Sequence, residues 1–204
     1  PAEPLGCAIN VFRRSAVRAG DTVAIIGIGF LGALLVRQAV DAGARVIAIS
    51  RRGSSLALAR RMGAAETVAM DDHWRIIEEV RLLTGEKLCD VAIEVVGKQW
   101  PLDLAAELVR DGGRLVIGGY HQDGPRQVNM QMWNWKGMDV INAHERDPEV
   151  VRRGMREAVA AVASGRLDPT PLYSQVFPLE DLGAALDATR DKPGDFVKAL
   201  ISCS

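Results

Sequence analysis

Three glycines lie close together near the start of the chain, in the order that a phosphate-binding turn requires. Gly27, Gly29 and Gly32 stand in the stretch VAIIGIGFLG with the spacing G-x-G-x-x-G. The first glycine permits a tight turn, the second admits a pyrophosphate to the backbone, and the third lets the following helix pack on the strand. Free N–H groups near Phe30 and Leu31 would then face the pyrophosphate. The spacing predicts a dinucleotide site, and the alternative is a glycine-rich turn without a ligand.

Ser50, Arg51 and Arg52 follow a short apolar run, RVIAIS at 45–50, that is typical of a buried strand. In a dinucleotide site this strand ends beside the adenosine ribose, where an acidic residue accepts from both ribose hydroxyls and selects NAD. Here no acidic residue follows until Glu66. A carboxylate would repel a 2′-phosphate, whereas a hydroxyl and two guanidinium groups would donate to it. We therefore expect NADP(H) to be preferred over NAD(H), with a solvated loop as the alternative.

The elements that must position these residues alternate along the chain, short apolar runs with amphipathic stretches of helical length. We expect strands at 22–27, 45–50, 66–70, 90–97, 113–120 and 138–143, and helices at 30–43, 54–63, 71–85, 101–110 and 147–165. Such alternation implies right-handed crossovers and a parallel sheet with helices on both faces. The predicted fold is therefore α/β, a Rossmann doubly wound sheet of six parallel strands.

Capping residues and prolines set the expected boundaries. Ser54 or Ser55 would cap the second of these helices, and Asp147 would cap the last one with Pro148 at its first position. The chain starts on Pro1 within an apparent helix start, so we expect further sequence upstream. Three prolines between 169 and 178 indicate a connecting segment. The expected organisation is a linking helix at 1–20, a dinucleotide-binding domain at 21–166 and a C-terminal segment at 167–204, with a helix near 179–190 and a strand at 196–202.

Composition and charge narrow the class of partner. The 204 residues are 48% hydrophobic and 25% charged, with a formal net charge of −1, whereas nucleic-acid-binding domains usually carry a basic excess. No apolar run approaches the roughly 18 residues of a membrane span. Cys7, Cys89 and Cys203 are odd in number and widely spaced. We expect no nucleic-acid partner, no membrane segment and a reducing cytoplasmic location.

Several stretches together resemble the medium-chain dehydrogenase/reductase family, in particular the zinc alcohol and polyol dehydrogenases. They are AEPLGCAINVFRR, AGDTVAIIGIGFLG, LARRMGAAETV, DVAIEVVG, DGGRLVIGG and FPLEDLGAALDATRDKPGDFVKALI. A member of that family also carries an amino-terminal catalytic domain that holds a catalytic zinc. The resemblance therefore implies that this chain is the coenzyme domain with the tail that returns to the catalytic domain, and that the chain alone is inactive.

The resemblance also implies further contacts, matched position by position. Glu3, in EPL, corresponds to an acidic position that ligates or approaches zinc in polyol-type members. The sixth strand would pair with its copy in a homodimer, or within a homotetramer. The implied coenzyme contacts are Val96 and Gly97 on the adenosine side, Gly118, Gly119, Tyr120, Ala143 and His144 near the nicotinamide, and Lys198 on the pyrophosphate.

Each of these positions has a purely structural alternative. Glu3 suits a helix start without any metal, with Pro4 at the first helical position, and Lys198 suits a solvated strand edge. Tyr120 and His121 could be ordinary loop residues. The tryptophan-containing stretch MQMWNWKG at 130–137 could wall a substrate pocket or form a dimer surface, and the sequence does not separate these two roles.

The function expected from these observations is an NADP(H)-dependent, zinc-assisted alcohol dehydrogenase or carbonyl reductase that acts on a small alcohol or carbonyl substrate. A zinc-free quinone or enoyl reductase of the same family is the near alternative. A dinucleotide sensor without turnover is a second alternative. An S-adenosylmethionine-dependent methyltransferase is the remote one, because its cofactor usually requires an acid where Ser50 stands.

Overall fold

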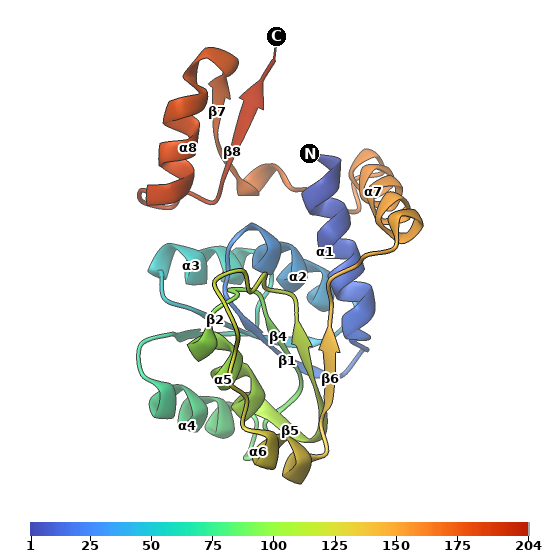
Figure 1. Ribbon diagram of the computed structural model, residues 1–204, viewed down its shortest axis with the longest axis vertical. Coiled ribbons are helices and arrows are strands. Elements are labelled where there is room, and N and C mark those ends of the chain that lie inside the picture. The colour runs from blue at the N-terminus through green and yellow to red at the C-terminus, as the bar shows by residue number, and fades with distance from the viewer. Residues whose placement is uncertain (204) are drawn as a thin grey trace.

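The computed structural model describes residues 1–203 and shows two parts (Figure 1). The larger part is a parallel sheet covered by helices, and the smaller part is built from the C-terminal residues. Ser204, the last residue of the expected C-terminal segment, lies outside the described residues.

The sheet has six parallel strands in the order β3-β2-β1-β4-β5-β6, so the predicted doubly wound α/β fold is confirmed. The strand order reverses between β1 and β4, and in such sheets ligands bind in the crevice outside the carboxyl ends of the strands at that point. The strands are β1 Thr22–Ile26, β2 Arg45–Ser50, β3 Glu66–Ala69, β4 Cys89–Glu94, β5 Val109–Ile117 and β6 Asp139–Asn142.

Helices cover both faces of the sheet. One apolar cluster joins α1, α2, α3 and α7 to one face, and a second cluster joins α4, α5 and α6 to the other. The central strands are therefore buried on both sides, which explains why they read as continuous apolar runs. The helices are α1 Ala2–Ser15, α2 Phe30–Asp41, α3 Gly53–Arg61, α4 His73–Leu83, α5 Gln99–Leu108, α6 Met130–Lys136 and α7 Pro148–Ala163.

Of two expected helix N-caps, the structure shows one and not the other. Asp147 accepts from the backbone N–H of Glu149 at 2.8 Å and Pro148 is the first residue of α7, as predicted. The prediction for α3 was wrong, because the helix begins at Gly53, before either serine, and its N-cap residue Arg52 makes no side-chain cap. Ser54 instead donates to the carbonyl oxygen of Gly194 at 3.3 Å.

The C-terminal part contains β7 Tyr173–Pro178, α8 Leu182–Asp191 and β8 Lys198–Ser202, with single 3₁₀ turns at Thr170–Leu172 and Leu179–Asp181. The expected helix and final strand are α8 and β8. The region expected as a connecting segment holds β7, which pairs in parallel with β8. The prolines do not interrupt β7, since Pro178 is its last residue and Pro171 lies in the preceding 3₁₀ turn.

Candidate functional site

The glycine turn joins β1 to α2 at the centre of the carboxyl edge of the sheet. Gly27 has φ +100°, a conformation that side-chain-bearing residues rarely adopt. A Cβ on Gly32 would collide with the carbonyl oxygen of Gly27, whereas a Cβ on Gly29 would meet no atom within 4 Å. The turn is therefore tight where the helix meets the strand and open where a ligand would approach.

The start of α2 offers an anion site. Gly29 is the N-cap residue and supplies no side chain, and the first turn, which contains Phe30 and Leu31, carries no acidic residue. The first N–H groups of a helix lack partners within the helix, and the helix dipole adds about half a positive charge there. A diphosphate would accept hydrogen bonds from these N–H groups and would be attracted by this partial charge.

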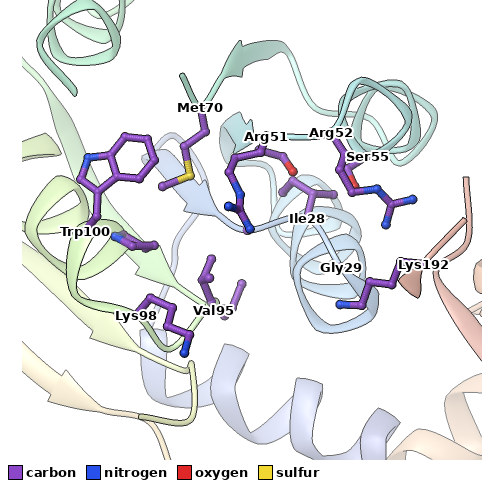
Figure 2. A pocket seen from close by; sticks show the side chains of 14 residues that line it. Ile28, Gly29, Arg51, Arg52, Ser55, Met70, Val95, Lys98, Trp100 and Lys192 are labelled. Atoms are coloured by element: carbon purple, nitrogen blue, oxygen red, sulfur yellow. The ribbon is translucent and has the colours of Figure 1, made fainter. Parts of the chain in front are cut away.

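A cleft of about 390 Å³ extends from this turn toward the end of β2 (Figure 2). We call it the first cleft. None of the described residues that line it is Asp or Glu, and four carry positive charge: Arg51, Arg52, Lys98 and Lys192. The first cleft is therefore suited to a ligand that carries several negative charges.

The three residues predicted to hold a 2′-phosphate behave differently. Ser50 is buried at the end of β2. Arg51 is exposed, and its side chain makes no hydrogen bond or ion pair within residues 1–203. Arg52 lines the cleft, but its guanidinium donates to the carbonyl oxygens of Gly194 at 2.7 Å and Phe196 at 3.0 Å. Of the two described arginines that line the first cleft, Arg51 is the one left available to a ligand.

The sequence analysis did not identify two lysines that line the first cleft. Lys98 follows the turn after β4, and its ammonium group lies 2.5 Å from the Asp123 carboxylate. Hydrogen bonds from Lys98 and Arg126 hold the pKa of Asp123 well below its usual range. Lys192 is the C-cap residue of α8, in a left-handed conformation with φ 47°. Lys192 comes from far along the chain, so only the fold brings it to the cleft.

An apolar wall stands on the β3 and β4 side of the first cleft. Met70 and Trp100 lie close together there, with Val95 opposite (Figure 2). The indole nitrogen of Trp100 donates to Nδ1 of His73 at 3.0 Å, which leaves its ring surface for a ligand. Flat aromatic surfaces favour stacking of ring systems, so this wall suits an adenine.

The turn after β4 is held by a buried carboxylate, Glu94. Its Oε1 accepts from the backbone N–H groups of Val96 at 2.5 Å and Gly97 at 2.7 Å. Gly97 has φ +79°, and a Cβ there would collide with the carbonyl oxygen of Tyr120. Val96 lines the first cleft, whereas Gly97 is buried beneath it.

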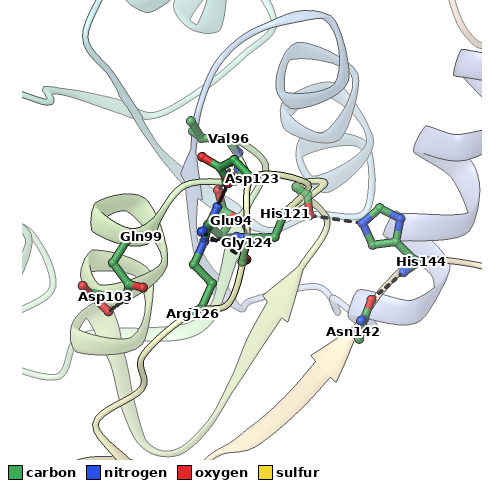
Figure 3. A network of polar contacts seen from close by, with 12 residues as sticks. Glu94, Val96, Gln99, Asp103, His121, Asp123, Gly124, Arg126, Asn142 and His144 are labelled. Atoms are coloured by element: carbon green, nitrogen blue, oxygen red, sulfur yellow. Dashed lines mark hydrogen bonds and ion pairs between the residues drawn. The ribbon is translucent and has the colours of Figure 1, made fainter.

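A histidine joins this carboxylate to the loop after β5 (Figure 3). Nε2 of His121 lies 3.0 Å from Oε2 of Glu94, and Nδ1 of His121 lies 2.8 Å from Nε of Arg126. Because the guanidinium nitrogen only donates, Nδ1 accepts and Nε2 carries the proton that Glu94 accepts. Arg126 also donates to the carbonyl oxygen of Gly97 at 3.0 Å. The network fixes two loops at the carboxyl edge, and the sequence analysis did not find it.

The residues predicted near a nicotinamide gather at the ends of β5 and β6. Gly119, Tyr120 and His144 line a second cleft of about 420 Å³. Gly118 and Ala143 are buried in the strand ends behind it. The residues at 130–137, in which the sequence left two roles open, line neither of these two clefts.

Lys198 lies near the start of α2. Its ammonium group is 5.4 Å from the ring centroid of Phe30, which stacks on Tyr173 with centroids 6.2 Å apart. Lys198 does not line the first cleft. The contact places a positive charge beside the turn where a diphosphate would rest.

Residues 31–163 match the family described as zinc-binding dehydrogenase. The chain belongs to this family. The expected resemblance to zinc-type medium-chain dehydrogenases is thereby confirmed.

Relatives in the zinc-binding dehydrogenase family extend beyond the matched region. The chain is 29% identical over 202 residues to 2-dehydro-3-deoxy-L-galactonate 5-dehydrogenase of Pseudoalteromonas atlantica, covering 99% of this chain and 57% of that protein. It is 31% identical over 192 residues to L-threonine 3-dehydrogenase of Bacillus velezensis, covering 92% and 53%. The chain thus spans about half the length of the curated relatives it matches.

Solved structures in the family have the same fold. Alcohol dehydrogenase TADH from Thermus sp. ATN1 superposes with a TM-score of 0.84 at 27% identity, covering 98% of this chain and 57% of that one. A zinc-binding dehydrogenase from Sinorhizobium meliloti 1021, solved with NADP bound, gives 0.83 at 28% identity with the same coverage. Among residues 1–203, no helix is both long and apolar enough to cross a membrane.

The described part of the chain contains no complete set of zinc ligands. A protein zinc site takes at least three side-chain ligands, and residues 1–203 contain no group of three candidates. Glu3, near the start of α1, accepts from the Cys7 thiol at 3.0 Å. Burial, together with Glu3, raises the pKa of that thiol to about 12. Cys7 is therefore protonated at neutral pH, and Glu3 stands as a single candidate ligand.

Proposed function

We propose that this chain is the coenzyme-binding part of an NADP(H)-dependent oxidoreductase that acts on an alcohol or carbonyl compound. The relatives named above are dehydrogenases of hydroxyl-bearing compounds, which supports the reaction class. The observation that carries the coenzyme preference is the charge of the first cleft. Its lining holds Ser50 and the unpaired Arg51 at the end of β2 and no carboxylate.

The bound coenzyme would run from one cleft to the other. Its adenine would rest against Trp100 and Met70, and its 2′-phosphate would face Arg51 and Lys192. The diphosphate would take the N–H groups at the start of α2, close to Lys198. The remaining half would extend to Gly119 and Tyr120 in the second cleft. When bound, the nicotinamide supplies or accepts the hydride, and the residues of this chain hold its position and face.

Zinc assistance is part of the proposal at the family level only. The family description includes zinc binding, and Glu3 occupies the position that approaches zinc in polyol-type members. Because a single carboxylate does not make a zinc site, the remaining ligands would have to be supplied by residues outside this chain. We therefore propose that the chain alone binds the coenzyme without turnover.

Two statements about the whole protein complete the proposal. We place the protein in the cytoplasm, on the basis of its free cysteines. We also propose that β6, the edge strand of the sheet, pairs with its copy in a homodimer. The apparent mass in sedimentation equilibrium tests the second statement, because a monomer at all concentrations would contradict it.

The main test replaces Arg51. We expect Arg51→Gln to weaken NADPH binding roughly 10- to 100-fold, since hydrogen bonds to charged groups contribute about 1.5–3 kcal/mol. NADH, which lacks the 2′-phosphate, should bind the variant as it binds the parent chain. Affinities follow from quenching of tryptophan fluorescence or from calorimetry.

The matched control is Arg61→Gln. Arg61 is an exposed arginine of α3 that makes no hydrogen bond or ion pair within the described residues, and both affinities should stay unchanged. Equal affinity of the parent chain for NADPH and NADH would contradict the proposed preference.

Two alternatives remain open within this scheme. A non-catalytic sensor and a zinc-free reductase would both bind NADPH in the first cleft, so the binding test does not separate them. Oxidation of NADPH by a longer form of the protein, with and without a zinc chelator, separates them. The family match leaves the methyltransferase alternative without support.

A further inference from the structure

The second cleft lies at the carboxyl ends of β5 and β6, and the proposed function puts the nicotinamide against its Gly119 and Tyr120 side. Its lining residues are Arg14, Ile117, Gly119, Tyr120, His121, Asn142, His144 and Arg146. A substrate that exchanges hydride with a nicotinamide must lie against that ring, so the groups of this cleft can reach the substrate.

Most acceptor atoms on this wall are already used by the protein. The carbonyl oxygen of Gly119 lies 3.1 Å from Nε2 of His144, which must donate because a carbonyl only accepts. Oδ1 of Asn142 accepts from the backbone N–H of His144 at 3.1 Å. Both ring nitrogens of His121 are engaged, with Glu94 and Arg126 (Figure 3). Nδ1 of His144 is the ring acceptor that remains.

The groups left over are donors. Within residues 1–203, the guanidinium of Arg146 makes no hydrogen bond or ion pair, and the hydroxyl of Tyr120 makes no hydrogen bond. Because Oδ1 of Asn142 faces the backbone of His144, the amide nitrogen of Asn142 is left to the cleft. Arg14 reaches one carboxylate oxygen, on Glu145, at the long distance of 3.7 Å.

The lining of the second cleft carries the positive charges of Arg14 and Arg146. No described residue that lines it is acidic. Two acids contact the lining residues: Glu94, whose Oε2 accepts from His121 at 3.0 Å, and Glu145, whose Oε1 accepts from the backbone N–H groups of Arg146 at 2.8 Å and Asp147 at 3.0 Å. These hydrogen bonds lower the pKa of Glu145, so it stays ionised and partly offsets Arg14. Arg146 makes no ion pair with any acid in the described part of the chain.

We propose that the second cleft binds a carboxylate of the substrate, so that the compound oxidised or reduced is a hydroxy acid or the corresponding keto acid. This inference rests on the proposed function and specifies its substrate class. A guanidinium matches a carboxylate with paired N–H donors, and Arg146, with Arg14 beside it, supplies that match. Nδ1 of His144 supplies an acceptor for a substrate hydroxyl.

The test compares two probes of equal chain length, D-gluconate and D-sorbitol, which differ in the carboxylate. Each is titrated into the 204-residue chain, with and without saturating NADPH, and binding is followed by ligand-observed NMR. We expect gluconate to bind at least about tenfold more tightly than sorbitol, since a charge-assisted pair contributes more than a neutral one. The difference should shrink to within about threefold in Arg146→Gln and also decrease in Arg14→Gln.

The matched control is Arg156→Gln. Arg156 is exposed on α7, lies outside the second cleft and makes no hydrogen bond or ion pair among the described residues, so the preference for gluconate should persist. Equal binding of the two probes, or an unchanged preference in Arg146→Gln, overturns the inference. Failure of NADPH to bind would instead contradict the proposed function. The titrations without NADPH test carboxylate binding in the second cleft independently of the coenzyme.

Discussion

Glu94 is a fully buried carboxylate that the fold satisfies with three donors. Its two oxygens accept from the N–H groups of Val96 and Gly97 and from His121. Its carbonyl oxygen accepts from the N–H groups of Gly118 and Gly119. An unpaired buried charge costs several kcal/mol, so such groups persist where their partners are in place. One residue thus fixes both turns between which a coenzyme would pass.

We expect Glu94→Gln to destabilise the fold by about 1–3 kcal/mol, the cost of leaving buried polar groups badly paired. A glutamine amide would turn its own N–H groups toward the Nε2–H of His121, and two donors do not pair. The midpoint of urea unfolding, followed by circular dichroism, measures the change. Glu78→Gln, on the exposed face of α4 and without a partner among residues 1–203, should stay within about 0.5 kcal/mol of the parent chain.

At the scale of elements, α2 and the glycine turn act as one unit. The helix starts so close to the strand that the third glycine touches the carbonyl oxygen of the first. The residues that precede the helix, Gly27 to Gly29, line the first cleft, so the free N–H groups of the first helical turn lie next to it. The position of α2, more than any side chain on it, makes the anion site.

Gly32→Ala tests this unit. The added methyl would force α2 away from Gly27, and overpacking of this kind costs roughly 1–3 kcal/mol. We expect the thermal midpoint to fall and the affinities for NADPH and NADH to fall together by about tenfold or more. Gly183→Ala, in α8 with no atom within 4 Å of the new Cβ, should instead be neutral or stabilising by about 0.5–1 kcal/mol. An unchanged affinity in Gly32→Ala would show that the diphosphate does not rest on this helix.

The elements themselves were largely predictable, because apolar periodicity reports burial directly. The sequence predicted all six strands of the sheet and its doubly wound topology, but it did not predict α6 or β7. The helix at 130–136 is preceded by an N-cap residue, Asn129, whose side chain accepts from the backbone N–H of Met132 at 3.0 Å. That signal was readable, but α6 spans seven residues and has no buried residue to reveal a period. In β7 the flanking prolines concealed a short strand.

The site was predictable where local spacing determines geometry. The glycine turn depends on neighbours in the chain, and the structure gives it the expected strand-turn-helix setting. Other parts of the site depend on tertiary structure, and no local sequence pattern predicts them. These are the positions of Lys98 and Lys192 and the contact of Glu94 with His121. Arg51 and Arg52 show the limit most clearly, since of two adjacent arginines Arg52 is hydrogen-bonded to the C-terminal segment and Arg51 has no partner among residues 1–203. Only the position of the C-terminal unit separates their roles.

At the scale of the whole molecule, the C-terminal unit lies against the carboxyl edge of the sheet domain. Polar and ring contacts join Arg52 and Ser54 to the carbonyl oxygens of the 194–196 segment, and the Phe30 ring to Tyr173 and Lys198. Leu172 and Val197 also pack in the apolar cluster of the sheet domain. Of these residues, Arg52 lines the first cleft. The hydrogen bonds of Arg52 therefore hold the unit beside the end of β2, and Lys192 of α8 lines the same cleft.

Arg52→Met distinguishes this joining role from direct binding of a 2′-phosphate. The variant keeps the apolar stem and loses both hydrogen bonds to the C-terminal segment, each contributing about 1 kcal/mol. We expect hydrogen exchange, read by mass spectrometry, to rise several-fold at residues 192–203 while the strands of the sheet keep their protection. Affinities for NADPH and NADH should both fall, because the cleft wall loosens for both coenzymes, and NADPH should lose somewhat more because Lys192 faces its 2′-phosphate. Arg61→Met serves as the control and should change neither readout. If Arg52→Met weakened NADPH alone and left the exchange of residues 192–203 unaltered, Arg52 would be a phosphate ligand, as the sequence by itself predicts.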